Sequence, residues 1–265
     1  MPLTASDDNT HYVAVLPMKA AEIDLVHRVA SIIGKDLYGT RLLLAGRVPK
    51  IVARYDTREA AELTVTSLKG LGIPAITCQD VELRKPSRGF RAQSLRFGAG
   101  EITFSSKSGQ LAKMELDEAF LILTGRVETS ESIEVTRTKM KLNVPLTLLT
   151  GGIPVRRKVT EKATETVAHI ESFVRLYGRQ SPDSNIEIRQ HDFDYSCLPK
   201  VAASSQRNFG DLTATIRGAF PRAVFDDSLT GNFGLGLPYT TPSENVDIIC
   251  KLIYLFTRSS TRLDS

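Results

Sequence analysis

The segment that decides the N-terminal fold is Ile51–Cys78, IVARYDTREAAELTVTSLKGLGIPAITC. Its opening residues are β-branched, apolar and aromatic, which favours a strand. Asp56 and Glu59 then place carboxylates at the N-cap and N3 positions of a helix. Apolar residues recur at helical spacing up to a pair of glycines, which tolerate the left-handed exit from a helix. The segment predicts a strand, a helix and a second strand after Pro74.

The residues before this segment add three more elements to the same unit. Tyr12–Leu16 has the alternation of a strand and ends at a proline. An apolar stripe at helical spacing marks a helix from Ala20 to Ile33, closed by a glycine. A shorter helix is expected to start at Asp36 as its N-cap. The order over residues 12–79 is therefore strand, helix, helix, strand, helix, strand, which predicts one α/β sandwich.

Part of this region resembles a known family. Residues 23–44, 54–62 and 68–75 resemble the fold shared by the C-terminal domain of the ribosomal stalk protein and the ClpS-type protease adaptors. In particular, the run TREAAEL at residues 57–63, followed by LKGLGIPA at residues 68–75, is similar to the last helix of the stalk domain. The resemblance covers about a quarter of the chain. The adaptors' substrate-binding Asn-Asp pair and histidine are replaced here by residues 17–19, PMK, and 47–49, RVP. The stalk domain's lysine-rich face is also largely missing from this sequence, because Lys35 is the only lysine between Ala20 and Ala45. The resemblance implies a fold and a tendency to bind other proteins.

The pattern of predicted elements changes after residue 93, from alternating strands and helices to short strands. Residues 81–93 are rich in arginine, lysine, proline and glycine and are predicted to be a linker. Short strands separated by turns are expected at residues 94–97, 101–105, 111–116 and 119–125, and again at 172–178 and 185–191. A one-faced helix follows from Ser204 or Ser205 and is stopped by Pro221. Several strands closed by one helix resemble a pleckstrin-homology-like domain, here residues 94–225.

Residues 128–169 interrupt this series of strands as an insertion. Between residues 137 and 158 there are six cations and no acidic residue. A long hairpin or ordered loop is expected, with arms at residues 139–149 and 153–159 that turn at Gly151-Gly152; residues 160–170 are left open as helical or irregular. The basic hairpin is the first candidate contact surface, and its cations are Arg137, Lys139, Lys141, Arg156, Arg157 and Lys158.

Residues 226–265 comprise a glycine-rich loop and a final helix. The helix is expected from Pro242 to Phe256, and apolar residues leave it little polar face. An apolar helix of this kind has to be covered, by its own chain or by a partner. The second candidate contact surface is therefore formed by Ile249, Leu252, Ile253 and Phe256.

Enzymatic chemistry has weaker signals. His191 and Asp192 combine groups that bind divalent metals, and Asp226 begins a carboxylate pair. Adjacent residues of a strand point to opposite faces, and no second histidine stands at a useful spacing, so a strand end and a turn explain these residues equally well. The three cysteines have no C-x-x-C spacing and are expected to be buried hydrophobes. No catalytic residue, cofactor or metal is therefore predicted.

Composition restricts the remaining choices. A net charge of +4 is too small to indicate nucleic acid by itself, and no specific nucleic-acid recognition is expected. No apolar run approaches the ~20 residues needed to cross a bilayer, and residues 1–10 have no apolar signal core, so a frayed tail and a cytoplasmic protein are expected. The leading hypothesis is an α+β adaptor or accessory subunit that binds an acidic protein. The alternatives are peripheral binding to anionic lipid headgroups through the basic hairpin and the terminal helix, and a metal-dependent enzyme.

Overall fold

The computed structural model describes residues 10–18, 20–142, 156–231 and 241–261, and for residues 128–169 it describes the backbone alone. The chain divides into two compact units: Met1–Val127 with Glu171–Ser265, called the body below, and Glu128–Ile170, called the ribbon. Residues 1–9 of the predicted N-terminal tail, residues 143–155 of the predicted hairpin with its turn at Gly151-Gly152, and most of the glycine-rich loop lie outside the described residues. Thr10, predicted to belong to the tail, is instead buried.

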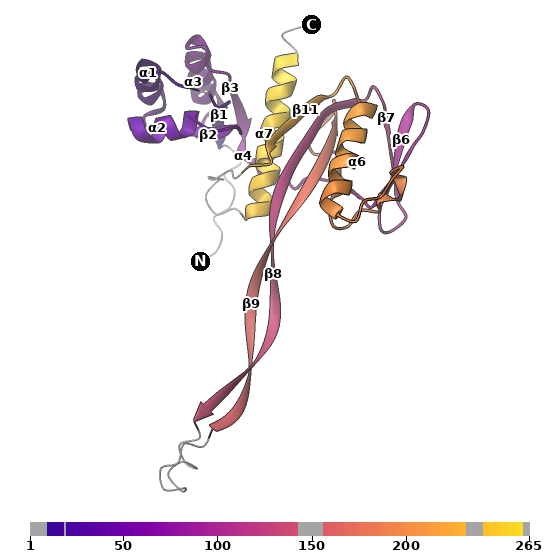
Figure 1. The fold of residues 1–265 in the computed structure, drawn as a ribbon. Coiled ribbons are helices and arrows are strands. Elements are labelled where there is room, and N and C mark those ends of the chain that lie inside the picture. The colour runs from indigo at the N-terminus through magenta and orange to yellow at the C-terminus, as the bar shows by residue number, and fades with distance from the viewer. Residues whose placement is uncertain (1–9, 19, 143–155, 232–240, 262–265) are drawn as a thin grey trace. The chain divides into compact units, whose positions relative to one another are not determined.

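The N-terminal part of the body has the predicted order of elements (Figure 1). Its three strands form an antiparallel sheet in the order β2-β1-β3, and its helices pack against that sheet. The bounds are β1 His11–Val15, α1 Ile23–Ile33, α2 Leu37–Leu44, β2 Lys50–Tyr55, α3 Arg58–Gly70 and β3 Ala75–Gln79. The α+β class is confirmed, whereas the family resemblance stays a prediction.

Two of the predicted helix starts can be compared with the structure directly. Asp36 caps α2, because its carboxylate accepts a hydrogen bond from the Gly39 amide at 2.8 Å. The N-cap of α3 was predicted one residue too early. Thr57, not Asp56, is the N-cap, and its hydroxyl accepts from the Ala60 amide at 3.4 Å. Thr57 competes successfully because a threonine hydroxyl caps a helix nearly as well as a carboxylate.

The predicted linker at residues 81–93 is instead largely structured. It begins inside α4, Asp80–Arg84, and contains β4, Phe90–Ala92. Leu83 and Ala92 are buried, and β4 pairs in parallel with β10, Asn185–Arg189. The sequence did not predict α4 and β4, because each of these two elements is rich in charged residues and has only one or two side chains in the core. A short element of this kind is stabilised by its neighbours and carries no periodic signal of its own.

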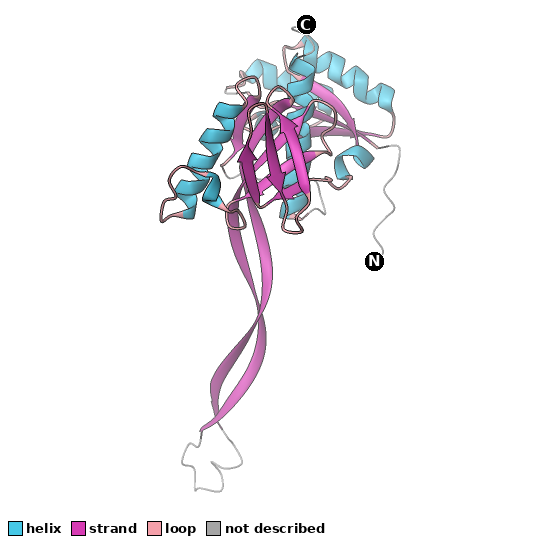
Figure 2. Cartoon of the chain, turned by 90° about the vertical axis from the view of Figure 1, so that its right-hand side faces the viewer, coloured by secondary structure: helices cyan, strands magenta, loops and turns pink. Residues whose placement is uncertain are grey.

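The remaining strands of the body form two sheets. The first has the order β5-β6-β7, and the second has the order β11-β8-β9-β10-β4. The bounds are β5 Ser94–Phe97, β6 Glu101–Ser105, β7 Leu111–Glu115, β8 Ala119–Leu142, β9 Arg156–Gly178 and β11 Val224–Leu229. Helix α6, Ser205–Ala219, shares one hydrophobic core with both sheets. Figure 2 shows these strands and helices by type.

Helix α7, Pro242–Thr261, lies between the five-stranded sheet and the N-terminal sheet β2-β1-β3 (Figure 1). Val246, Ile249 and Ile253 belong to a core built on the five-stranded sheet. Ile248 and Leu252 belong to a different core, together with residues of β1, β3 and α4. A helix that is apolar all round is usually buried, and the two cores explain why α7 has almost no polar face.

Candidate interaction surfaces

The four apolar residues of α7 that were expected to form a partner surface lie in the interior of the body. The exposed fractions are 6% for Ile249, 1% for Leu252, 3% for Ile253 and 4% for Phe256. The expectation is corrected accordingly: the chain covers this helix itself, and these side chains offer no surface to a partner. The sequence indicated that α7 had to be covered, but it did not show that two sheets of the same chain cover it.

Lys251 is a buried cation on α7, with 2% of its surface exposed. Its ammonium donates hydrogen bonds to the carbonyl oxygens of Glu82, at 2.9 Å, and Lys85, at 2.5 Å. Its third partner is the Asp183 carboxylate at 2.9 Å, which also pairs with the Lys85 ammonium at 2.7 Å. All three donors of the ammonium therefore have partners, which a buried lysine needs. Lys251 joins α7 to the end of α4 and to the connection between β9 and β10.

A second buried ion chain joins α7 to the five-stranded sheet. Arg175 on β9 has a side chain only 7% exposed, and its guanidinium lies 2.6 Å from both the Glu187 and the Asp247 carboxylates. Glu187 on β10 also accepts from Arg189 Nε at 2.6 Å. Arg189 in turn lies 3.7 Å from Glu171, whose carboxylate accepts from the His191 amide at 2.9 Å. These alternating charges hold β9, β10 and α7 in one register.

Sequence reasoning missed both ion clusters, although one signal for them exists. Asp247 and Lys251 are the charged residues that interrupt the apolar run of α7. Charges inside such a run predict buried, paired groups, because an unpaired charge in a core costs several kcal/mol. Their partners come from residues far away in the sequence, so the pairs themselves had no local signal.

Acid is expected to destabilise the body through these two clusters. Burial alone would raise the pKa of Glu187, but Arg175 and Arg189 outweigh it and hold that pKa below the ordinary 4.5. Burial would also raise the pKa of Asp183, but hydrogen bonds from Lys85 and Lys251 outweigh the effect of burial and hold that pKa below the ordinary 3.8. Because both pKa values are lower in the folded state, their contribution to stability is complete above the ordinary values and is lost as the pH falls through the folded values.

Urea unfolding between pH 7 and pH 3 checks this expectation. The free energy of unfolding should fall on the acid side, and it should fall less steeply in Glu187→Gln, which has no carboxyl to titrate at that position. Equal pH dependence in the wild type and the variant would contradict a role for Glu187 in acid sensitivity.

The residues weighed for metal chemistry lie in ordinary structural contacts. Asp192 forms an ion pair with Arg91, and Asp226 accepts a hydrogen bond from the Ser228 amide at 2.8 Å. His191 contacts Glu171 through its backbone amide. Within the described part of the chain, no group of three or more His, Cys, Asp or Glu side chains is placed to hold a metal ion. Among the described residues, these contacts join His191, Asp192 and Asp226 to other partners and not to one another, and the turn explains Asp226.

The cysteines are placed as inert hydrophobes rather than nucleophiles. Burial raises the pKa of the Cys78 thiol to about 12 and that of the Cys250 thiol to about 11. Cys197 is half-buried, and burial also raises its pKa. Because the thiolate is the reactive form, none of the three is activated in this fold.

The six cations of the basic hairpin all lie on the two strands that make up the ribbon. Arg137, Lys139 and Lys141 fall in the last six residues of β8, and Arg156, Arg157 and Lys158 open β9. The strands are much longer than the predicted arms. Residues 160–170, left open between helix and irregular structure, continue β9 as a strand.

The described residues include no helix with the length and apolar character needed to cross a membrane. Comparisons with protein-family models, with curated proteins and with solved structures found no match to this chain. The adaptor-like and pleckstrin-homology-like resemblances therefore stay predictions, and the account of function rests on the chain's own residues.

Proposed function

We propose that this protein is a non-enzymatic adaptor or accessory subunit, and that the basic end of the ribbon binds an acidic surface on a partner protein. The contact residues in this proposal are Arg137, Lys139 and Lys141 on β8, together with the cations of residues 156–158 on β9. A cytoplasmic location belongs to the same proposal.

The observation that carries the proposal is the ribbon itself. Strands β8 and β9 belong to the five-stranded sheet, and from Glu128 to Ile170 they form a compact unit of their own. A two-stranded ribbon is marginally stable in water, because it has no third strand or helix to bury a face. A two-stranded element that forms a unit apart from the body is better explained by a contact that it makes with another molecule.

The distribution of charge along the ribbon points to the kind of partner. Acidic residues are confined to the parts of β8 and β9 nearest in sequence to the body, at Glu128, Glu131, Glu134, Glu161 and Glu165. Cations without any acidic residue occupy residues 137–158. Opposite charge on a partner would raise the rate of association and fix its orientation, and salt would weaken the contact.

Two other partner classes have less support. Proteins that bind single-stranded nucleic acid interleave aromatic residues with their cations, and there is no aromatic residue between Arg137 and Lys158. The hypothesis of peripheral membrane binding requires both the basic hairpin and the apolar face of α7, but that face is buried in the body. An acidic protein surface therefore fits the described residues better than a bilayer.

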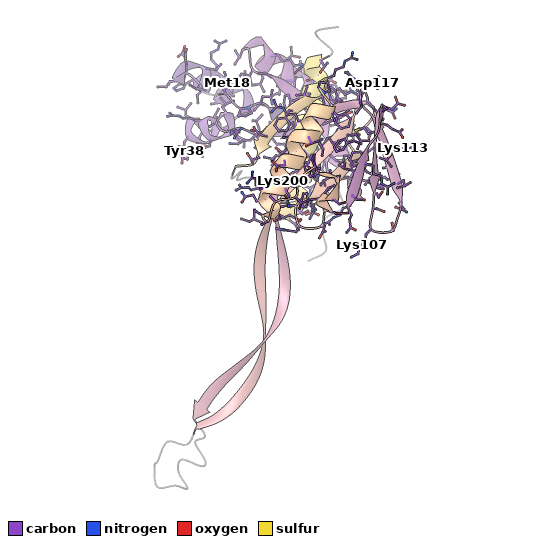
Figure 3. The ribbon with its side chains drawn as sticks, turned by 45° about the vertical axis from the view of Figure 1, so that its right-hand side comes forward. Met18, Tyr38, Lys107, Lys113, Asp117 and Lys200 are labelled. Atoms are coloured by element: carbon purple, nitrogen blue, oxygen red, sulfur yellow. The ribbon has the colours of Figure 1, made fainter. Side chains whose placement is uncertain are left out.

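The test is affinity capture from the native host with a matched pair of charge-reversed baits. One bait carries Arg156→Glu, Arg157→Glu and Lys158→Glu in the ribbon. The control carries Arg96→Glu, Lys107→Glu and Arg207→Glu, which make the same change in net charge at exposed positions of the body. Figure 3 labels Lys107 in the connection between β6 and β7. Retained proteins are identified by mass spectrometry at low and at high salt.

A partner retained by the wild type and the control bait, but lost from the ribbon bait and at high salt, would support the proposal. Identical partners on all three baits would contradict it, because the cations would then be only a solvated surface. Sedimentation with anionic vesicles provides the third outcome: binding that depends on the ribbon cations, without a protein partner, would replace the acidic protein with a lipid headgroup.

A further inference from the structure

A groove in the body lies between the end of α3 and the end of α7. It has a volume of about 980 Å³, at the upper end of the roughly 300–1,000 Å³ of small-molecule sites. Its accessible apolar lining is formed by the exposed Pro74 and the half-buried Leu255, beside the buried Ile73 and Phe256, and its cations are Lys69 and Arg258.

Local backbone contacts shape one wall of the groove. Gly72 has a φ of 77°, in the left-handed region that favours glycine, and it lets the chain leave α3 and turn into β3. The Gly72 amide donates to the Lys69 carbonyl at 2.9 Å, and the Ile73 amide donates to the Leu68 carbonyl at 3.1 Å. This wall is therefore fixed by hydrogen bonds within the chain before any ligand binds.

The opposite wall is the last turn of α7. The hydroxyl groups of Ser259 and Ser260 both donate to the Phe256 carbonyl, at 2.7 and 3.0 Å. Their hydrogen-bonding capacity as donors is thus used within the helix. The guanidinium of Arg258, which is half-buried, is the charged group that this wall supplies.

The charges of the groove have one sign. Among the described residues, no aspartate or glutamate lines it and neither Lys69 nor Arg258 belongs to an ion pair. Arg258 also forms a hydrogen bond with the Tyr254 hydroxyl, which leaves its positive charge unneutralised. Each cation also stands in the last turn of its helix, where it offsets the partial negative charge of the terminal carbonyl groups. That role concerns stability, so a test has to separate ligand binding from the stability of the two helix ends.

We propose that this groove binds a small amphipathic anion, with an apolar body against Pro74 and Leu255 and an acidic headgroup held by Lys69 and Arg258. The apolar surface accounts for the body of such a ligand, and two cations, with no carboxylate among the described residues that line the groove, account for its charge. A long-chain carboxylate is the simplest molecule of this class.

Isothermal titration calorimetry of the full chain with sodium dodecanoate, below its micelle concentration, tests the proposal. We expect saturable binding of one dodecanoate, and binding at least tenfold weaker for dodecyltrimethylammonium, which has the same tail and the opposite charge. The pair Lys69→Gln and Arg258→Gln should weaken dodecanoate binding at least tenfold. The control pair Arg41→Gln and Arg217→Gln removes last-turn cations from two other helices and should leave it unchanged.

Two further variants test whether the ligand occupies this groove. Ser260→Trp, at an exposed position, should block the groove with both cations in place. A chain that ends at Thr261 should bind dodecanoate with unchanged affinity. The proposal is overturned by absence of saturable binding, by equal affinity for the two amphiphiles, or by insensitivity to the Lys69 and Arg258 changes. Binding only in the shortened chain would also overturn it, because residues 262–265 would then exclude dodecanoate from the groove in the full chain.

Discussion

Replacing Lys251 with methionine is expected to lower the free energy of unfolding by about 3 kcal/mol, since removing one member of a buried ion pair costs roughly 3–5 kcal/mol. Methionine fills much the same volume, but it leaves the carbonyl groups of Glu82 and Lys85 without the donors that now lie at 2.9 and 2.5 Å. It also leaves Asp183 with Lys85 as its remaining ion-pair partner. Urea unfolding followed by circular dichroism measures the loss.

Lys85→Met is the matched control. The Lys85 ammonium pairs with the same carboxylate, but its side chain is 53% exposed. Exposed pairs contribute about 0–1 kcal/mol, so the control should lose less than about 1 kcal/mol. Equal losses in the two variants would show that the buried ammonium does not hold α7 against α4, and would contradict this account of the body.

The second large effect is expected from Arg175→Met. The variant leaves the Asp247 carboxylate without its ion-pair partner and leaves Glu187 with Arg189 alone. Because the group removed is almost fully buried, the free energy of unfolding should fall by about 3–4 kcal/mol. The measurement is again urea unfolding at pH 7.

A double variant shows whether the loss comes from the orphaned charge. Arg175→Met combined with Asp247→Leu removes the carboxylate that the single variant leaves unpaired. Replacing a whole buried ion pair with apolar residues is often close to neutral, so the double variant should be more stable than Arg175→Met alone. A double variant that is equally or less stable would mean that packing, not charge, determines the effect.

The sequence was most informative where the structure depends on neighbouring residues. Residues 12–79 form the predicted series of strands and helices, because caps such as Asp36 and apolar periodicity act within a few residues. The N-cap of α3 is Thr57, one residue after the predicted Asp56, because two adjacent residues are both good caps. Element type was therefore predictable, and the boundary was not.

The sequence was least informative where distant residues meet. Helix α4 and strand β4 have few core residues and exist because β10 and α7 are beside them. The apolar faces of α7 are compatible with a partner subunit or with the chain's own sheets, and only the fold decides between these. The ribbon was underestimated for another reason: its strands are mainly charged residues and threonine, so no apolar alternation marks their length.

We propose the basic end of the ribbon as a contact surface for an acidic protein. Photo-crosslinking in the native host tests it most directly, with a benzoylphenylalanine placed at Thr138 or Thr160 in the ribbon, or at the exposed Thr215 on α6 as the control. We expect one crosslinked protein from the two ribbon positions, none from Thr215, and loss of the product when residues 156–158 are reversed to glutamate. Crosslinks from Thr215 alone, or ribbon crosslinks that survive the charge reversal, would contradict it.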